Sequence, residues 1–88
     1  LYMLSFLSLS SNKLRFLKKQ WFEKLSILQE LNLNYNLIEK LENGIFSNLV
    51  NLEYLHLMKN KLNNIEPNAF KSLNYLLGID SVSYTHLT

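Results

Sequence analysis

Cysteine is absent from this 88-residue chain, and glycine and proline are scarce, with two and one residues respectively. Without cysteine there is no disulfide framework, no thiolate metal site and no cysteine nucleophile. The chain also lacks a glycine-rich phosphate loop, a His-Glu-x-x-His helix and an Asn-x-Ser/Thr glycosylation acceptor. We therefore predict that the chain is not an enzyme and holds no metal or cofactor. The missing glycosylation acceptor argues mildly against an extracellular location.

Charge is also sparse, with nine Lys and Arg, seven Asp and Glu, and a formal net charge of +2. A balance this small does not favour a nucleic-acid partner. The basic residues gather early, at Lys13, Arg15, Lys18, Lys19 and Lys24. This cluster leaves binding of a polyanion, such as a heparin-like glycan, as a minor alternative, although a solvated loop face is the simpler interpretation. No apolar run is long enough to cross a membrane, so no membrane contact is expected.

One pattern occurs three times at a spacing of 24 residues. It reads Leu-x-x-Leu-x-Leu-x-x-Asn-x-Leu/Ile and begins at Leu4, Leu28 and Leu52. A fixed period of this size indicates a solenoid of stacked units. The predicted units span residues 4–27, 28–51 and 52–75.

Each position in the repeat has a predicted structural role. The alternating leucines predict a short strand with one buried face, and stacking pairs these strands in a parallel sheet. The asparagine after each strand is expected inside the coil, where its amide can bond backbone groups of the turn. A phenylalanine ten residues later is expected to join a buried aromatic spine. The asparagines are Asn12, Asn36 and Asn60, and the phenylalanines are Phe22, Phe46 and Phe70.

The repeated pattern resembles the leucine-rich repeat family over residues 1–75. The 24-residue unit with its phenylalanine is similar to the typical subtype of Toll-like receptor ectodomains and matrix proteins. The resemblance implies an α/β solenoid, a horseshoe fragment with short parallel strands on the concave face. Loops or single helical turns are expected on the convex side. Because the chain opens on Leu1 with no polar cap before Leu4, we expect a fragment of a longer array.

The resemblance also places ligand binding on the concave face. Side chains between the leucines should face outward and stack in rows, and aromatic, Met, Asn and Ser residues suit a protein-binding patch. The rows are Phe6, Glu30 and Tyr54; Ser8, Asn32 and His56; and Ser10, Asn34 and Met58, flanked by Ser11, Tyr35 and Lys59. His56 is interpreted as a lone, exposed contact residue. The competing interpretation is an unused stretch of a longer array.

The pattern decays after residue 75. Ser81, Tyr84 and His86 stand where Leu, Asn and Leu or Ile are expected. Residues 76–88 are therefore predicted to be either a decaying last repeat, because terminal repeats are atypical, or a non-native tail like a translated sequencing adapter.

These observations favour a protein-recognition module with a protein ligand. The resemblance suggests a receptor ectodomain or a secreted protein, and hence an extracellular or cell-surface location. The alternative is a cytoplasmic repeat scaffold or regulatory arm.

Overall fold

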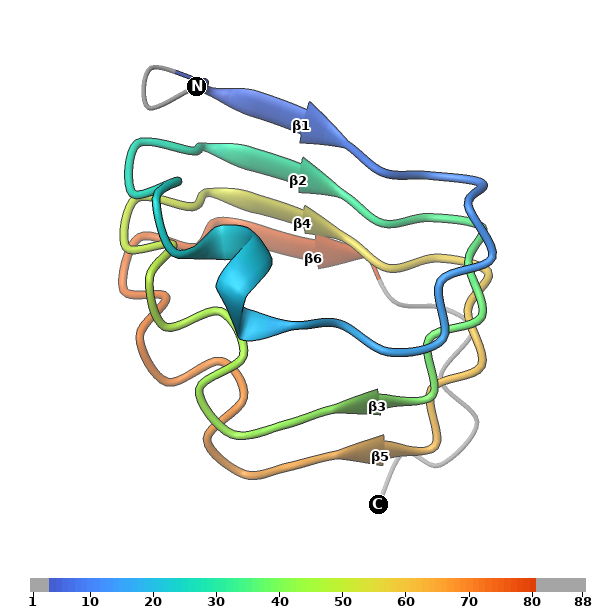
Figure 1. Ribbon diagram of the computed structural model, residues 1–88. Helices are drawn as coiled ribbons and strands as arrows, with labels where there is room; N and C mark the ends of the chain where they lie inside the picture. Colours follow the sequence, from blue (N-terminus) through green and yellow to red (C-terminus); the bar gives the residue numbers. More distant parts are fainter. Residues whose placement is uncertain (1–3, 81–88) are drawn as a thin grey trace.

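A four-stranded parallel sheet forms one side of the molecule in the computed structural model, which describes residues 4–80 (Figure 1). Its strands run in the order β1, β2, β4 and β6, and each pair is offset by 24 residues. The strands are β1 (Phe6–Ser8), β2 (Glu30–Asn32), β4 (Tyr54–His56) and β6 (Gly78–Asp80). The parallel strands predicted from the repeat are thus present, and successive units stack as a solenoid.

Strand β6 comes from the segment in which the repeat pattern decays. Ile79 pairs with Leu55 of β4, so residues 78–80 continue the sheet in the same register as the earlier units. The rest of the predicted tail, residues 81–88, lies outside the described residues.

The side of the coil opposite the sheet is mostly turns. It carries a second, two-stranded parallel sheet of β3 (Lys40–Leu41) and β5 (Asn64–Ile65), and a single 3-10 helix, η1 (Lys19–Phe22) (Figure 1). Residues 4–80 contain no α-helix, and the loops and single helical turn expected on this side are present. The chain reverses direction here within a few residues, and bonds such as Ala69 N–H to the Glu66 carbonyl make turns too short to propagate a helix.

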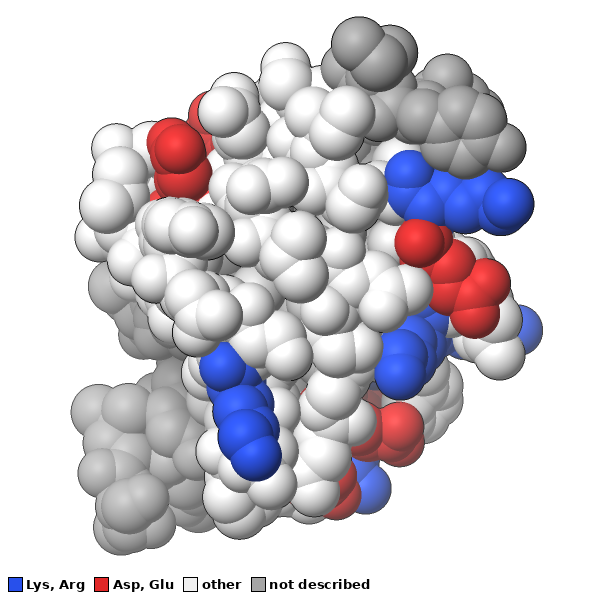
Figure 2. Space-filling view, turned by 90° about the vertical axis from the view of Figure 1, so that its left-hand side faces the viewer, with Lys and Arg blue, Asp and Glu red and all other residues white. Residues whose placement is uncertain are grey.

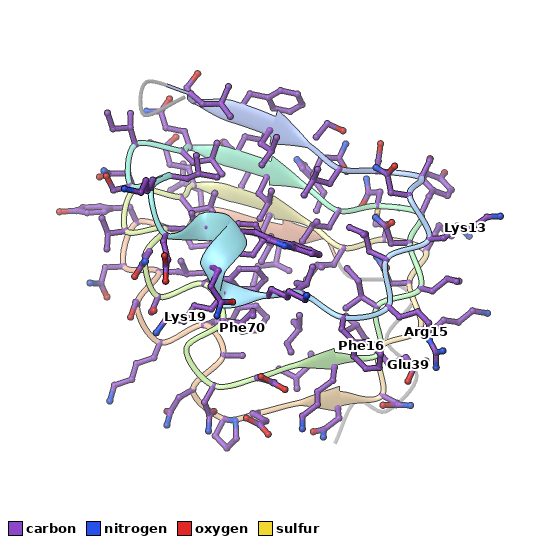
Figure 3. All side chains as sticks on the ribbon, viewed as in Figure 1. Lys13, Arg15, Phe16, Lys19, Glu39 and Phe70 are labelled. Carbon is purple, nitrogen blue, oxygen red and sulfur yellow. The ribbon has the colours of Figure 1, made fainter. Side chains whose placement is uncertain are left out.

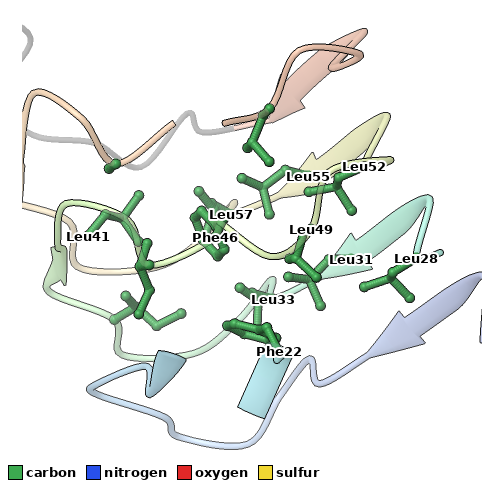
Figure 4. Packing of buried hydrophobic residues seen from close by; sticks show 14 of the residues in the cluster. Phe22, Leu28, Leu31, Leu33, Leu41, Phe46, Leu49, Leu52, Leu55 and Leu57 are labelled. Carbon is green, nitrogen blue, oxygen red and sulfur yellow. The ribbon is translucent and has the colours of Figure 1, made fainter. Parts of the chain in front are cut away.

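The interior is a stack of leucines closed by aromatic rings (Figure 4). Leu31, Leu33, Leu55 and Leu57 have no exposed surface. Alternation along each strand drives this burial, because every second side chain points into the coil. Leu7, in the first unit, is only partly buried since it lies at the end of the described coil.

The three phenylalanines form a row. The ring centroids of Phe22 and Phe46 are 5.8 Å apart, and those of Phe46 and Phe70 are 6.2 Å apart. Phe22 and Phe46 are fully buried, whereas Phe70 is only partly buried, which differs from the expected fully buried spine. Burial is greatest for the rings that have a neighbouring unit on both sides or the helix η1 beside them.

The asparagines after the strands bond the backbone of their own unit and of the unit before. Asn36 Oδ1 accepts the N–H groups of Asn12 and Leu14, at 2.9 and 3.0 Å, and its Nδ2 donates to the carbonyls of Leu9 and Leu33, both at 3.0 Å. Asn60 repeats the arrangement one unit later.

Asn12 departs from the expected buried position. Its side chain is exposed and donates only within its own unit, to the carbonyls of Leu9 and Ser10. The difference arises because burial of Asn36 and Asn60 comes from the unit stacked before each of them, and Asn12 stands in the first unit.

Candidate functional site

The outward side of the four-stranded sheet carries the rows of side chains predicted to bind a ligand. We call it the sheet face. Its first row contains Phe6, Glu30 and Tyr54, which the strand register places side by side. Phe6 and Tyr54 are 49% and 44% exposed, large values for aromatic side chains on paired strands. Within residues 4–80 neither ring packs against another ring, so their exposed area is free for a partner.

The position of the Tyr54 ring depends on Gly78, its register partner on β6. A Cβ added to Gly78 would lie 3.7 Å from Tyr54 Cδ1, in ordinary contact. The ring therefore occupies space beside the glycine.

Glu30 and His56 form a hydrogen-bonded pair across the sheet face. His56 Nε2 lies 2.8 Å from Glu30 Oε2, and the two side chains are 21% and 40% exposed. The prediction of a lone, exposed His56 is therefore wrong. The contact is diagonal, from β2 to the next row of β4, and a row-by-row alignment of the repeats does not reveal it.

The middle and last rows partly serve the fold. Asn32 Oδ1 accepts the N–H of Asn34 at 2.9 Å, and Asn34 Oδ1 accepts the N–H of Met58 at 2.7 Å. Ser8 takes the equivalent place in the first unit, where its Oγ accepts the N–H of Ser10 at 3.5 Å. The amide oxygens of Asn32 and Asn34 are thus engaged, which leaves their NH₂ groups as the more available donors.

The flanking positions, Ser11, Tyr35 and Lys59, lie in turns with a left-handed backbone. Their φ values are 61°, 59° and 61°. Such values are uncommon outside glycine, asparagine and aspartate, so these residue types give no sequence signal for them. The turn leaves Tyr35 59% exposed at the end of β2, next to the rest of the sheet face.

Charge is divided between the two sides of the coil. None of the nine Lys and Arg residues lies in β1, β2, β4 or β6. On the side opposite the sheet face, which we call the loop side, Arg15 pairs with Glu39 at 3.0 Å and Lys40 pairs with Glu66 at 3.4 Å. Each pair links one unit to the next.

The basic residues of the first unit do not gather in one patch. Figure 3 places Lys13 and Arg15 at one side of the coil and Lys19 at the other. The Arg15 guanidinium is bonded to Glu39 and lies 5.5 Å from the centroid of the Phe16 ring. Lys13 and Arg15 therefore do not form one patch with Lys19.

Glu66 stands at a junction between two loops. Its carboxylate accepts the Asn43 N–H at 2.8 Å, and this hydrogen bond, together with Lys40, holds the pKa of Glu66 below its ordinary value. The neighbouring Asn43 Oδ1 accepts the Asn68 N–H at 2.8 Å. These contacts couple the second and third units on the loop side.

Two further surfaces are exposed and apolar. Figure 2 shows that the side where the loops enter the strands is largely uncharged at its centre, and Ile27, Val50 and Tyr75 are exposed in these loops. At the end of the coil, an open hollow of about 510 Å³ is lined by Leu7, Leu9, Asn12, Leu14 and Trp21. The repeat pattern in the sequence identifies neither surface as a site.

Other kinds of site find no support in the described part of the chain. Among residues 4–80, no three His, Asp or Glu side chains come together as a metal site. The same residues include no helix of sufficient length and apolarity to span a membrane.

One side of the coil is a parallel sheet and the other consists mostly of turns. Inside, Asn36 and Asn60 bond the backbone of adjacent units and form an asparagine ladder. This architecture is a repeat solenoid, which presents an extended surface. A family model described as leucine rich repeat matches residues 3–62 and, in an overlapping match, residues 36–80. The chain belongs to the leucine-rich repeat family, whose domains generally mediate protein–protein interaction. No curated protein matches the chain significantly.

Proposed function

We propose that this chain is a protein-recognition module and that the sheet face is its binding surface. The observation that carries the proposal is the first row, Phe6, Glu30 and Tyr54. Two half-exposed aromatic rings flank a carboxylate on paired strands, and the fold does not use either ring for packing against another ring within the described residues. Exposed aromatic side chains on a rigid backbone are typical binding anchors.

The surrounding residues support the same use. Tyr35 adds a third exposed aromatic side chain at the end of β2, and the NH₂ groups of Asn32 and Asn34 supply hydrogen-bond donors. Because the strands are paired, these groups lose little conformational entropy when a ligand binds. The surface thus combines apolar area with directional polar contacts.

The proposed setting is a receptor ectodomain or a secreted protein, outside the cell, in a longer horseshoe-shaped array. The 24-residue period and the phenylalanine row support it, since both resemble the typical repeats of such proteins. A cytoplasmic scaffold or regulatory arm is the alternative. Sequencing the parent transcript through both ends separates them: a signal peptide and cysteine-rich caps favour the first, and a kinase or nucleotide-binding segment favours the second.

The binding surface can be tested without knowing the natural ligand. Peptides selected from a displayed random library against the folded 88-residue chain are added to ¹⁵N-labelled protein, and the shifted amide signals are mapped. We expect the largest changes in β1, β2 and β4 and in the turn at Tyr35. Changes concentrated around β3 and β5 would refute the sheet face as the binding surface.

A further inference from the structure

We propose that Glu30 is the receptor for a basic side chain, preferably an arginine, of the protein partner. The guanidinium would bond the Glu30 carboxylate while lying between the rings of Phe6 and Tyr54. This inference rests on the proposed function of the sheet face and names the chemistry of its partner.

The charge of the sheet face differs in sign from that of the whole chain. The chain carries a formal charge of +2, yet the charged residues of the four strands, with histidine neutral, are Glu30 and Asp80, both acidic. All nine Lys and Arg residues lie in loops, in turns or on the loop side. The nearest in sequence is Lys59, in the turn after β4. A partner docking on the strands therefore meets a local negative charge, which favours a basic ligand.

The Glu30 carboxylate is held in place and still has a vacant acceptor. His56 Nε2 bonds Oε2 at 2.8 Å, which orients the group, while Oε1 accepts no hydrogen bond from residues 4–80. The carboxylate side chain is 40% exposed. It can therefore accept a further charge-assisted hydrogen bond from outside the molecule without losing its internal partner.

The spacing of the strands that carry the two rings suits a cation between them. Phe6 and Tyr54 flank Glu30 on the neighbouring strands, and adjacent strands lie about 4.8 Å apart, so the two backbone positions are about 9–10 Å apart. A cation above Glu30 can then lie within about 6 Å of both rings, the range of a cation–π contact. The Tyr54 ring lies beside Gly78, where no side chain competes with it for space.

Arginine fits this site better than lysine. Its guanidinium is planar, stacks on aromatic faces and presents several donors in one plane, whereas the lysine ammonium is a compact and strongly hydrated charge. The loop side already contains such a combination, with Arg15 bonded to Glu39 and lying near the Phe16 ring. There the arginine is internal, and on the sheet face we infer that the partner supplies it.

The test is an NMR titration of the 88-residue chain at low salt with three blocked tripeptides, Ala-Arg-Ala, Ala-Lys-Ala and Ala-Glu-Ala. The arginine peptide should shift the signals of Phe6, Glu30 and Tyr54 saturably, the lysine peptide more weakly, and the glutamate peptide not at all. This comparison uses the unaltered chain, so it decides the inference whether or not a variant folds. Equal or stronger binding of the glutamate peptide, or no saturable shift with any peptide, would overturn it.

Two matched variants then test whether the Glu30 carboxylate is the group that binds the arginine peptide. Glu30→Gln should weaken binding of the arginine peptide at least fivefold, while Glu42→Gln, which removes the same charge from an exposed loop, should change it less than twofold. Unchanged affinity in Glu30→Gln contradicts the inference. If the glutamate peptide shifts the sheet-face signals instead, the basic partner is wrong but the sheet face remains the binding surface. If the arginine peptide shifts only loop-side signals, both proposals fail.

Discussion

The sheet face and the loop side contain similar chemical groups but use them differently. Each has exposed aromatic rings and a carboxylate bonded to a nitrogen-containing side chain. On the loop side, Arg15 joins Glu39 of the next unit and lies near the ring of Phe16. On the sheet face, Phe6 and Tyr54 have no ring partner in the described residues. The loop side uses its charges to couple neighbouring units, whereas the sheet face leaves apolar rings and a carboxylate oxygen available.

The largest expected effect comes from the aromatic spine, on which both sides depend. Phe46 is fully buried between Phe22 and Phe70, and Phe46→Ala should destabilise the chain by about 3–5 kcal/mol, enough to unfold a coil of few units. Phe16→Ala, at a 62% exposed position, is the control and should shift a urea melt much less. Similar losses in the two variants would show that the spine is not the core of the coil.

Asparagines in interior units should contribute more to stability than the asparagine at the end of the coil. Asn36→Ala removes a buried amide and leaves the part-buried N–H groups of Asn12 and Leu14 without their acceptor, and it should cost about 1–3 kcal/mol. Asn12→Ala should cost less, since that side chain is exposed and water can replace its bonds. Urea melts measure both variants, and an equal cost would contradict the difference in burial.

The smallest expected effect is the pH dependence of stability that arises from Glu66 on the loop side. The folded-state pKa of Glu66 lies below its ordinary value of 4.5, chiefly because the carboxylate accepts the Asn43 N–H, so its ionised form favours the folded state. That contribution is present above the unfolded-state pKa and is lost as the pH falls through the lower folded-state pKa. The unaltered chain should therefore be slightly more stable than Glu66→Gln at pH 7, and the gap between their urea midpoints should close in acid. A gap that widens in acid would contradict this sign.

Much of the fold could be predicted because, in a 24-residue repeat, equivalent residues occupy equivalent positions in every unit. The strands, their parallel register and the inward-pointing leucines follow from this equivalence of positions. Asn12 shows its limit, since identical residues differ in burial when one stands in the first unit. The strands β3 and β5 were missed because two-residue strands contain no alternation to detect.

The candidate site was less predictable than the fold. The outward rows follow from the strand phase, but the Glu30–His56 contact runs diagonally between rows and depends on side-chain conformation. The left-handed turn at Tyr35 lacks the glycine or asparagine that usually marks such a backbone. The packing of Tyr54 beside Gly78 requires β6, which comes from the decaying end of the pattern.

The most direct test of the sheet face compares the affinities of two aromatic deletions for one library-selected ligand. Tyr54→Ala removes a ring that is 44% exposed on the sheet face, and Phe16→Ala removes one that is 62% exposed on the loop side. With both variants folded, Tyr54→Ala should weaken binding by more than about 1 kcal/mol, or roughly fivefold, as expected for a binding anchor, and Phe16→Ala should leave it nearly unchanged. A loss of affinity in Phe16→Ala alone would contradict the account and place recognition on the loop side.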